Sequence, residues 1–457
     1  MSGDLRSYLR ALRTEAPAEL WEIDGPVSLN YEMAAYAMEL ERQAVPPVLL
    51  FRHVEGFSAP VVANVFASRK RIARILGVEE HELVSRWPAL AARRLKPERS
   101  PDAPVKEVMT TGSDVDLWRY PIPVHFETDA GRYISGGVII SRDPDTGVGN
   151  LNFSRLQVKG PALLGASLHS RGDLWNMQRR RAASHQPLEV AVAIGVHPAI
   201  AIAAATQLPA SEDELELAGG LVGQPVPVAP AETVDLLVPA QAEMVIEGYI
   251  EADNHEDEGP FNEYTGYSTH RSTRHLLHVT AITHRHDMIF QDVVPGNSSE
   301  HLNLSKTSRV PRVFDVVKRT FANAVAINYP FSGTHFHCYL AMRDPLPGQA
   351  RQAMLLLFGL DMYLKLVVVV NEDVDVYNEQ EVLWALATRF QADRDLFVVP
   401  GVTCNLLDPS ARDGMAAKLG LDATRAPDFS AVRMSLPEDV VQQVRDAIAA
   451  RAAGAAG

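Results

Sequence analysis

The stretch LKLVVVVNEDVDVYNEQEVLWALATRF, residues 364–390, decides the fold class of the C-terminal third of the chain. It begins with an unbroken run of valines, which is typical of a strand buried on both faces of a parallel sheet. An acidic turn and then a run with apolar residues at helical spacing follow it. Because strand, turn and helix in this order form a βα unit, we expect a C-terminal α/β domain over residues 327–457, which ends in a helix beginning near Pro437.

Upstream of this domain, over residues 105–300, the sequence changes to short apolar runs broken by turns. The runs YISGGVIIS (133–141), EMVIEGYI (243–250) and MIFQDVV (288–294) have the composition of strands. We therefore expect a mostly antiparallel β domain with helical insertions. A helix over residues 301–326 is expected to connect it to the C-terminal domain.

The first 104 residues form a third unit. Leu5, Leu9 and Leu12 recur at helical spacing, and two short apolar runs and a further helical run follow them. This order predicts a small α/β unit. The proline-rich stretch LKPERSPDAPVKEV, residues 95–108, predicts the linker to the β domain.

Composition excludes several classes of protein. Acidic residues outnumber basic ones by 57 to 43, and the net charge of −14 argues against a nucleic-acid partner, which would need a basic face. The N-terminus lacks the apolar core of a signal peptide, and no apolar run is long enough to cross a membrane. We expect a cytoplasmic protein without a membrane partner, and its two cysteines are expected to be free thiols.

The acidic stretch EDEGPFNEY, residues 256–264, is the first candidate for a catalytic site. Glu258 and Glu263 are separated by Gly-Pro-Phe-Asn, which can form neither a regular helix nor a central strand. Taken alone, the stretch is equally consistent with a solvated turn.

The common cofactor and hydrolase motifs are missing. The chain has no G-x-x-x-x-G-K-[ST] motif, no strand–G-x-G-x-x-G–helix unit and no G-x-S-x-G motif. The chemistry therefore has to come from carboxylates, an arginine and scattered polar side chains.

Several sequence motifs, taken in their order along the chain, resemble those of a known family. They are RDPDTGVGNLNFSRLQVKGP (142–161), LHSRGD (168–173), VPVAPAETVDLLVPAQAEMVIEGYI (226–250), EGPFNEYTGY (258–267) and VNEDVDVYNEQEVLWALATRF (370–390). Together they resemble the UbiD family of prenylated-FMN-dependent decarboxylases. The resemblance implies an α/β (α+β) protein whose central domain is a split β-barrel-like flavin-binding domain. It also implies that the C-terminal α/β domain mediates self-association, in a homodimer or a higher homo-oligomer.

The resemblance also implies functional residues, carried over position by position. In NLNFSR, Asn150 and Arg155 keep the spacing of the family's metal-binding asparagine and catalytic arginine. The family's metal-binding histidine and glutamate are placed at His169 and Glu232, and its two catalytic acids at Glu258 and Glu263. Lys365 is aligned loosely with a position near the cofactor phosphate.

The implied chemistry is the reversible, non-oxidative loss of CO2 from an unsaturated carbon. Such a carbanion needs an electron sink that no side chain supplies, so a cofactor is required. In the family this cofactor is prenylated FMN, made by a flavin prenyltransferase, which forms a covalent adduct with the substrate that a glutamic acid then protonates. A phosphate held through oxygen-rich ligands suits Mn²⁺ or Mg²⁺, with K⁺ as a further candidate ion.

The substrate stays open between aromatic, furan, pyrrole and indole acids, with His301 and Asn303 as candidate substrate contacts. Two other enzymatic readings stay open: a UbiD-type polyprenyl-hydroxybenzoate decarboxylase, and a flavin-free metal-dependent hydrolase that uses Asn150, His169 and Glu232. A non-enzymatic scaffold is the third alternative, and the retained Arg155, Glu258 and Glu263 speak against it.

Overall fold

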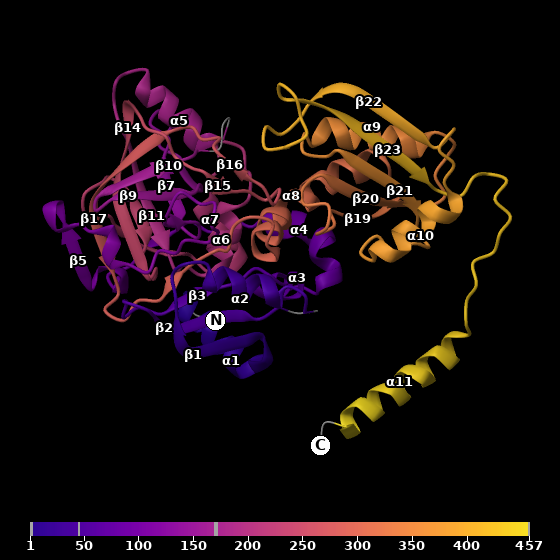
Figure 1. The fold of residues 1–457 in the computed structure, drawn as a ribbon, viewed down its shortest axis with the longest axis horizontal. Helices are drawn as coiled ribbons and strands as arrows, with labels where there is room; N and C mark the ends of the chain where they lie inside the picture. The colour runs from indigo at the N-terminus through magenta and orange to yellow at the C-terminus, as the bar shows by residue number, and fades with distance from the viewer. Residues whose placement is uncertain (1–2, 44–45, 169–171, 456–457) are drawn as a thin grey trace.

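The computed structural model describes residues 3–43, 46–168 and 172–455. Figure 1 shows an N-terminal part and a central part packed together on one side, and a C-terminal part on the other. The last helix, α11 (Glu438–Ala455), lies away from this body at the end of an extended segment. No helix in these ranges has both the length and the apolar composition needed to span a bilayer.

The N-terminal part is a small sheet covered by helices. Its helices are α1 (Leu5–Glu15), α2 (Glu32–Leu40), α3 (Arg69–Ile75) and α4 (Leu83–Ala91), and its strands are β1 (Leu20–Val27), β2 (Val48–Val54) and β3 (Val61–Ala63). Helix α1 forms as expected, because Leu5, Leu9 and Leu12 are buried on one face and Asp4 caps its N-terminus by accepting from the Ser7 N–H at 2.8 Å.

One expected strand of the central domain pairs elsewhere. Within MIFQDVV only β18 (Phe290–Gln291) is a strand, and it pairs in parallel with β3 as the last strand of the N-terminal sheet. The chain therefore returns to the N-terminal part before it enters the connecting helix.

The central part is built on a nine-stranded sheet that curls into a half-barrel, as the split-barrel prediction required. In spatial order its strands are β6 (Tyr133–Ile134), β9 (Leu156–Gly160), β10 (Leu163–Ala166), β17 (His275–His284), β14 (Met244–His255), β11 (Leu188–Ile194), β7 (Val138–Arg142) and β8 (Gly149–Phe153), and β5 (Val108–Thr111) also pairs with β17. Smaller ribbons are formed by β4 (Glu98–Arg99), β12 (Pro227–Pro230) and β13 (Leu237–Pro239), and by β15 (Phe261–Asn262) and β16 (Ser268–Thr269).

Each face of this sheet packs against a different core. On β11, Ala191 and Ala193 face the core that contains α6 (Pro198–Ala204) and α7 (Glu214–Val222), whereas Val190 and Val192 face the other core. Successive side chains of a strand point to opposite faces, so a strand buried on both faces reads as a continuous apolar run. Helix α5 (Asp173–Ala182) packs on the second core.

The connecting helix is α8 (Ser299–Thr320), which continues through Pro311. It begins at Ser298, whose hydroxyl accepts from the His301 N–H at 3.1 Å, and it ends before the expected 326. The five-stranded C-terminal sheet follows, with β20, β21 and β23 parallel to one another. The elements of this part are β19 (Ala324–Asn328), β20 (His337–Met342), α9 (Gln349–Leu360), β21 (Leu366–Asn371), α10 (Glu379–Arg389), β22 (Leu396–Thr403) and β23 (Met415–Ala423).

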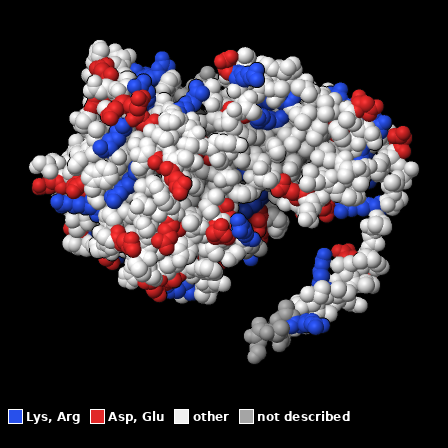
Figure 2. Space-filling view, viewed as in Figure 1, with Lys and Arg blue, Asp and Glu red and all other residues white. Residues whose placement is uncertain are grey.

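The strand, turn and helix expected at 364–390 are β21 and α10, so the α/β prediction for the C-terminal part is confirmed. On the face of the molecule in Figure 2, acidic and basic side chains are interspersed. The domain boundaries expected from the sequence remain a prediction.

Candidate active site

The structure brings Arg155, Glu258 and Glu263 together. Arg155 lies in the turn between β8 and β9, and its guanidinium holds Glu258 through two bonds, Nε to Oε1 at 3.0 Å and Nη2 to Oε2 at 3.0 Å. Its third nitrogen, Nη1, donates to Oε1 of Glu263. The planar guanidinium presents several donors in a fixed geometry, so one arginine orients both carboxylates.

The three side chains are largely shielded from water. The exposed fraction of the side chain is 9% for Arg155, 0% for Glu258 and 13% for Glu263. Burial raises the pKa of the Glu263 carboxyl, the Arg155 charge opposes this shift, and the nearby Glu258 and Asp129 carboxylates add to it. The environment therefore favours the protonated form of Glu263 more than water would.

The acidic loop has a defined shape. Gly259 has φ of +100°, a conformation that favours glycine, and the next peptide bond, to Pro260, is cis. Phe261 lies against the guanidinium, with Arg155 Cζ 4.9 Å from the ring centroid. This ring also packs on Tyr133, at 4.5 Å between centroids. The loop is thus a packed part of the site rather than a solvated turn.

Tyr133 is a site residue that the sequence did not reveal. Its side chain is fully buried on β6, where burial and the neighbouring Glu258 carboxylate, to which the hydroxyl hydrogen-bonds, raise its pKa. Only its pairing with the distant acidic loop distinguishes it from an ordinary core tyrosine, and nothing in its local sequence reports that pairing.

A second loop holds the acidic loop from outside. Asp129 accepts from the Asn262 backbone N–H at 2.9 Å and from the Asn262 side-chain amide at 3.0 Å. The neighbouring Ala130 N–H donates to the Pro260 carbonyl at 2.8 Å. These bonds fix the acidic loop on both sides of Phe261, between Glu258 and Glu263.

Asn150 lies on β8 beside a carboxylate from α7. The Asn150 amide donates to Glu214 Oε2 at 3.3 Å, and the Leu151 N–H donates to the same oxygen at 2.9 Å. Asn150 Oδ1 is buried and has no hydrogen-bond partner among the described residues. Burial raises the pKa of Glu214 to about 8, the Leu151 N–H opposes the shift, and Asp213 adds to it.

A glycine allows this approach. A Cβ atom at position 149 would lie 2.4 Å from an Asp213 carboxylate oxygen, so with any other residue here the Asp213 side chain would have to shift. The sequence contained a usable signal for Glu214: in SEDELELAGG, Asp213 caps a helix and Glu214 lies in its first turn.

Glu232, which was expected to bind the metal, lies elsewhere. Its carboxylate pairs with Lys106 Nζ at 2.5 Å, and its backbone N–H donates to Glu247 on β14. Glu247 belongs to a row of cross-strand partners that runs to β8 through Ala191, Ile140 and Leu151. Partners in one row face the same side of a sheet, whereas Asn150, next to Leu151, faces the other. The carboxylate beside Asn150 is thus that of Glu214, and a metal-binding role for Glu232 stays a prediction that these contacts do not support.

For two other residues, which were expected to bind the metal or the cofactor, the structure gives no supporting contact. His169 lies outside the described residues. Lys365 pairs with Asp408 at 2.9 Å and Ser410 at 2.6 Å, so its charge is already balanced within the C-terminal part. No group of three or more His, Cys, Asp or Glu side chains within the described ranges is arranged to hold a metal ion.

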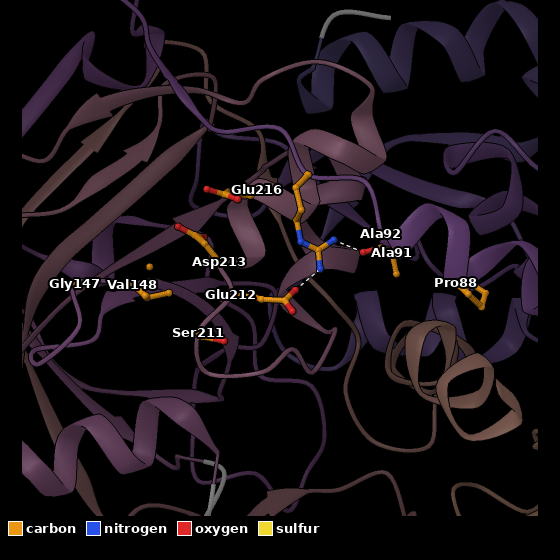
Figure 3. Close-up of a pocket in the computed structure, with 11 residues that line it drawn as sticks. Pro88, Ala91, Ala92, Gly147, Val148, Ser211, Glu212, Asp213 and Glu216 are labelled. Atoms are coloured by element: carbon orange, nitrogen blue, oxygen red, sulfur yellow. Dashed lines mark hydrogen bonds and ion pairs between the residues drawn. The ribbon is translucent and has the colours of Figure 1, made fainter. Parts of the chain in front are cut away.

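A cleft of about 760 Å³ is lined by Gly149 and Asp213, the chain neighbours of Asn150 and Glu214. Figure 3 shows Gly147, Val148, Glu212 and Asp213 around it, on the β7–β8 turn and the segment before α7. Across the cleft, Arg94 pairs with Glu212 at 2.6 Å. The edge of the sheet that carries Asn150 therefore borders open space.

The two candidate substrate contacts have internal partners. His301 Nδ1 hydrogen-bonds the Gly296 carbonyl at 2.9 Å, and the Asn303 amide donates to the Ala67 carbonyl at 3.0 Å. A substrate role for either residue remains a prediction.

Comparisons with known proteins decide the family. Models of the N-terminal, Rift-related and C-terminal domains of 3-octaprenyl-4-hydroxybenzoate carboxy-lyase match residues 12–90, 96–298 and 303–423. The chain is also 31% identical to anhydromevalonate phosphate decarboxylase from Methanosarcina mazei, over 90% of this chain and 94% of the relative. The chain belongs to the UbiD family.

Solved structures of UbiD-class enzymes agree with this assignment. The enzyme HmfF from Pelotomaculum thermopropionicum in complex with FMN superposes with a TM-score of 0.90, at 35% identity over 95% of this chain and 97% of that one. An evolved dimeric form of HmfF in complex with prenylated FMN superposes with a TM-score of 0.87, at 33% identity over the same shares. The chain is thus a UbiD-class carboxy-lyase, and flavin is the cofactor that this kinship supports.

Proposed function

We propose that this chain catalyses the reversible, non-oxidative decarboxylation of an aromatic or heteroaromatic acid with prenylated FMN. The observation that carries the proposal is the buried group in which Arg155 binds both Glu258 and Glu263. A scaffold would have no need to keep two carboxylates and one guanidinium away from water, because desolvating charges is costly.

The metal belongs to the edge of β8. Asn150 Oδ1 is buried, has no hydrogen-bond partner among the described residues and lies beside the Glu214 carboxylate, whose pKa is raised mainly by burial. These oxygen donors fit Mn²⁺ or Mg²⁺. Asn150 and Glu214 would hold the ion, with His169 as the third ligand implied by the family. K⁺ remains a prediction for which these contacts give no further argument.

The side chains of the acidic group have separate tasks. When bound, prenylated FMN would supply the electron sink that loss of CO2 from an unsaturated carbon requires. Glu263 holds a proton on its carboxyl group and delivers it to the carbon that has lost CO2. Arg155 remains charged and fixes the direction of that carboxyl, while Glu258 fixes the orientation of the guanidinium through its two hydrogen bonds.

An aromatic substrate is favoured by the side chains next to Glu263. Tyr264 packs against His335, Phe336 and Tyr363, with ring centroids 4.6, 5.8 and 5.8 Å away. Such rings suit a flat acid. An aliphatic unsaturated acid is the second candidate, because anhydromevalonate phosphate is the substrate named for one relative.

The test uses protein produced together with a flavin prenyltransferase and purified without oxygen. We expect a flavin absorbance spectrum, CO2 release from at least one acid of an aromatic, heteroaromatic and aliphatic panel, and deuterium at the carbon that lost CO2 when the reaction runs in D2O. A colourless protein that hydrolyses esters or amides with metal alone would establish the hydrolase alternative instead.

Self-association is a further part of the proposal. The segment before α11 exposes Val432, Met434 and Leu436, at 91%, 96% and 75%, and one related HmfF structure is dimeric. Apolar side chains this exposed are typical of an interface. Light scattering should report more than one copy, and a chain ending at residue 430 should associate less.

A further inference from the structure

Three buried polar atoms next to the acidic loop have no hydrogen-bond partner among the described residues. They are the Tyr264 hydroxyl, His335 Nδ1 and Thr334 Oγ1. Tyr264 directly follows Glu263, is 5% exposed, and packs against the ring of His335, which is 3% exposed. Leaving buried polar atoms unpaired costs free energy, so such a cluster is expected to meet a ligand.

The neighbours of His335 determine which of its ring nitrogens carries no proton. Ser305 has one hydroxyl proton, and its Oγ donates to the Leu302 carbonyl at 3.0 Å. The contact of 3.1 Å between Ser305 Oγ and His335 Nε2 is then made by the Nε2 proton. Burial, together with the charges of Arg309 and Lys306, holds the pKa of His335 well below its usual range. His335 is therefore neutral, and Nδ1 presents a lone pair.

The two cations near this cluster are already engaged. Arg309 donates to Asp361 from Nε at 2.8 Å and also from Nη2. Lys306 donates from Nζ to the Tyr329 and Pro330 carbonyls at 3.2 and 3.0 Å. Both cations are thus held by protein groups, and the atoms of the cluster that lack a partner among the described residues are those of Tyr264, His335 and Thr334.

We infer that Tyr264 and His335 recognise a hydrogen-bond donor on the ring of the acid, either a ring N–H or a hydroxyl group. This inference rests on the proposed decarboxylase function and narrows its substrate class. The His335 lone pair accepts from an N–H or O–H and repels a ring oxygen, and in this arrangement the Tyr264 hydroxyl oxygen is a second acceptor for the same ring donor. A buried site of this kind discriminates strongly, because the wrong ring leaves its polar atoms unpaired.

A matched pair of substrates tests the inference. Pyrrole-2-carboxylate and 2-furoate have rings of nearly equal size and differ in an N–H against an oxygen. Each acid is titrated calorimetrically into the flavin-loaded protein, and kcat/KM for CO2 release is measured in parallel. We expect tighter binding and faster turnover of the pyrrole acid.

The variants isolate the two atoms. His335→Phe and the nearly isosteric Tyr264→Phe should each reduce the preference for the pyrrole acid by roughly ten- to a hundred-fold, the effect of one lost buried hydrogen bond. His337→Phe is the matched control, because His337 lies on the neighbouring strand β20 and should leave the preference unchanged. Thermal unfolding of all three proteins identifies a variant that has not folded.

The outcomes separate the inference from the function on which it rests. Equal binding of both acids, or equal losses for both acids in His335→Phe and Tyr264→Phe, would overturn the inference while CO2 release still supported the decarboxylase. Preferential binding of the pyrrole acid without any CO2 release would support ring recognition and refute the decarboxylase. Binding of neither acid would overturn the inference.

Discussion

The metal site offers a direct comparison between two glutamates. In Glu214→Gln the carboxylate next to Asn150 loses its charge, so we expect Mn²⁺ and flavin to be retained poorly. Glu232→Gln removes an equally large carboxylate that pairs with Lys106 instead, so it should bind Mn²⁺ like the parent protein. The two substitutions are chemically identical, and only the position of the residue differs.

The expected magnitude follows from the proton that competes with the metal. In the metal-free protein the pKa of Glu214 is raised to about 8, so the carboxyl is protonated below that pH and must lose its proton when the ion binds. The ionised fraction is roughly one tenth at pH 7 and one hundredth at pH 6. Mn²⁺ affinity should therefore fall as the pH falls through about 8, by about tenfold per pH unit.

The assay is the equilibrium binding of Mn²⁺ to metal-free protein between pH 6 and 9, followed by the electron paramagnetic resonance signal of the free ion. The parent protein and Glu232→Gln should show the same pH dependence, while Glu214→Gln should bind weakly with a flatter profile. Normal Mn²⁺ binding by Glu214→Gln together with loss of binding in Glu232→Gln would refute the assignment.

Three further predictions concern the acidic group. Glu263→Gln should slow CO2 release and deuterium incorporation by roughly a hundred- to ten-thousand-fold with flavin still bound, and near-normal turnover would assign the proton to another group. Because Glu263 has to be protonated to act as the acid, activity should fall as the pH rises through its raised pKa. Asp129→Asn removes a charge that raises this pKa, so the alkaline limb of its pH–activity profile should move to lower pH. An unmoved limb would contradict this coupling. Arg155→Met should lower the free energy of unfolding by about 3–5 kcal/mol, because it leaves the buried Glu258 carboxylate without its positively charged partner. The double variant Arg155→Met/Glu258→Gln should recover part of that loss in denaturant titrations, and a purely additive result would show that the pair is not coupled.

The sequence predicted those elements whose signal is local. The valine run of β21, the capped helix α1 and the Gly-Pro turn between Glu258 and Glu263 each follow from residues close together in the chain. Pairings over long distances left no such signal. The two-residue strand β18 joins β3 of the N-terminal sheet across more than two hundred residues, and its own composition fits any sheet.

The same distinction applies to the glutamate of the proposed metal site. Both Glu214 and Glu232 are acidic residues beside apolar runs, so composition cannot separate them. They differ in the face of the sheet to which they belong. The loop of Glu232 binds Glu247 on one face, whereas Asn150 points to the other. The N-terminus of α7 reaches Asn150 around the open edge of β8. Glycine at position 149 leaves room there for the Asp213 side chain, which would otherwise have to shift. Which carboxylate lies beside Asn150 thus depends on the strand order of the sheet, whereas the local sequence around Glu214 predicts only a capped helix.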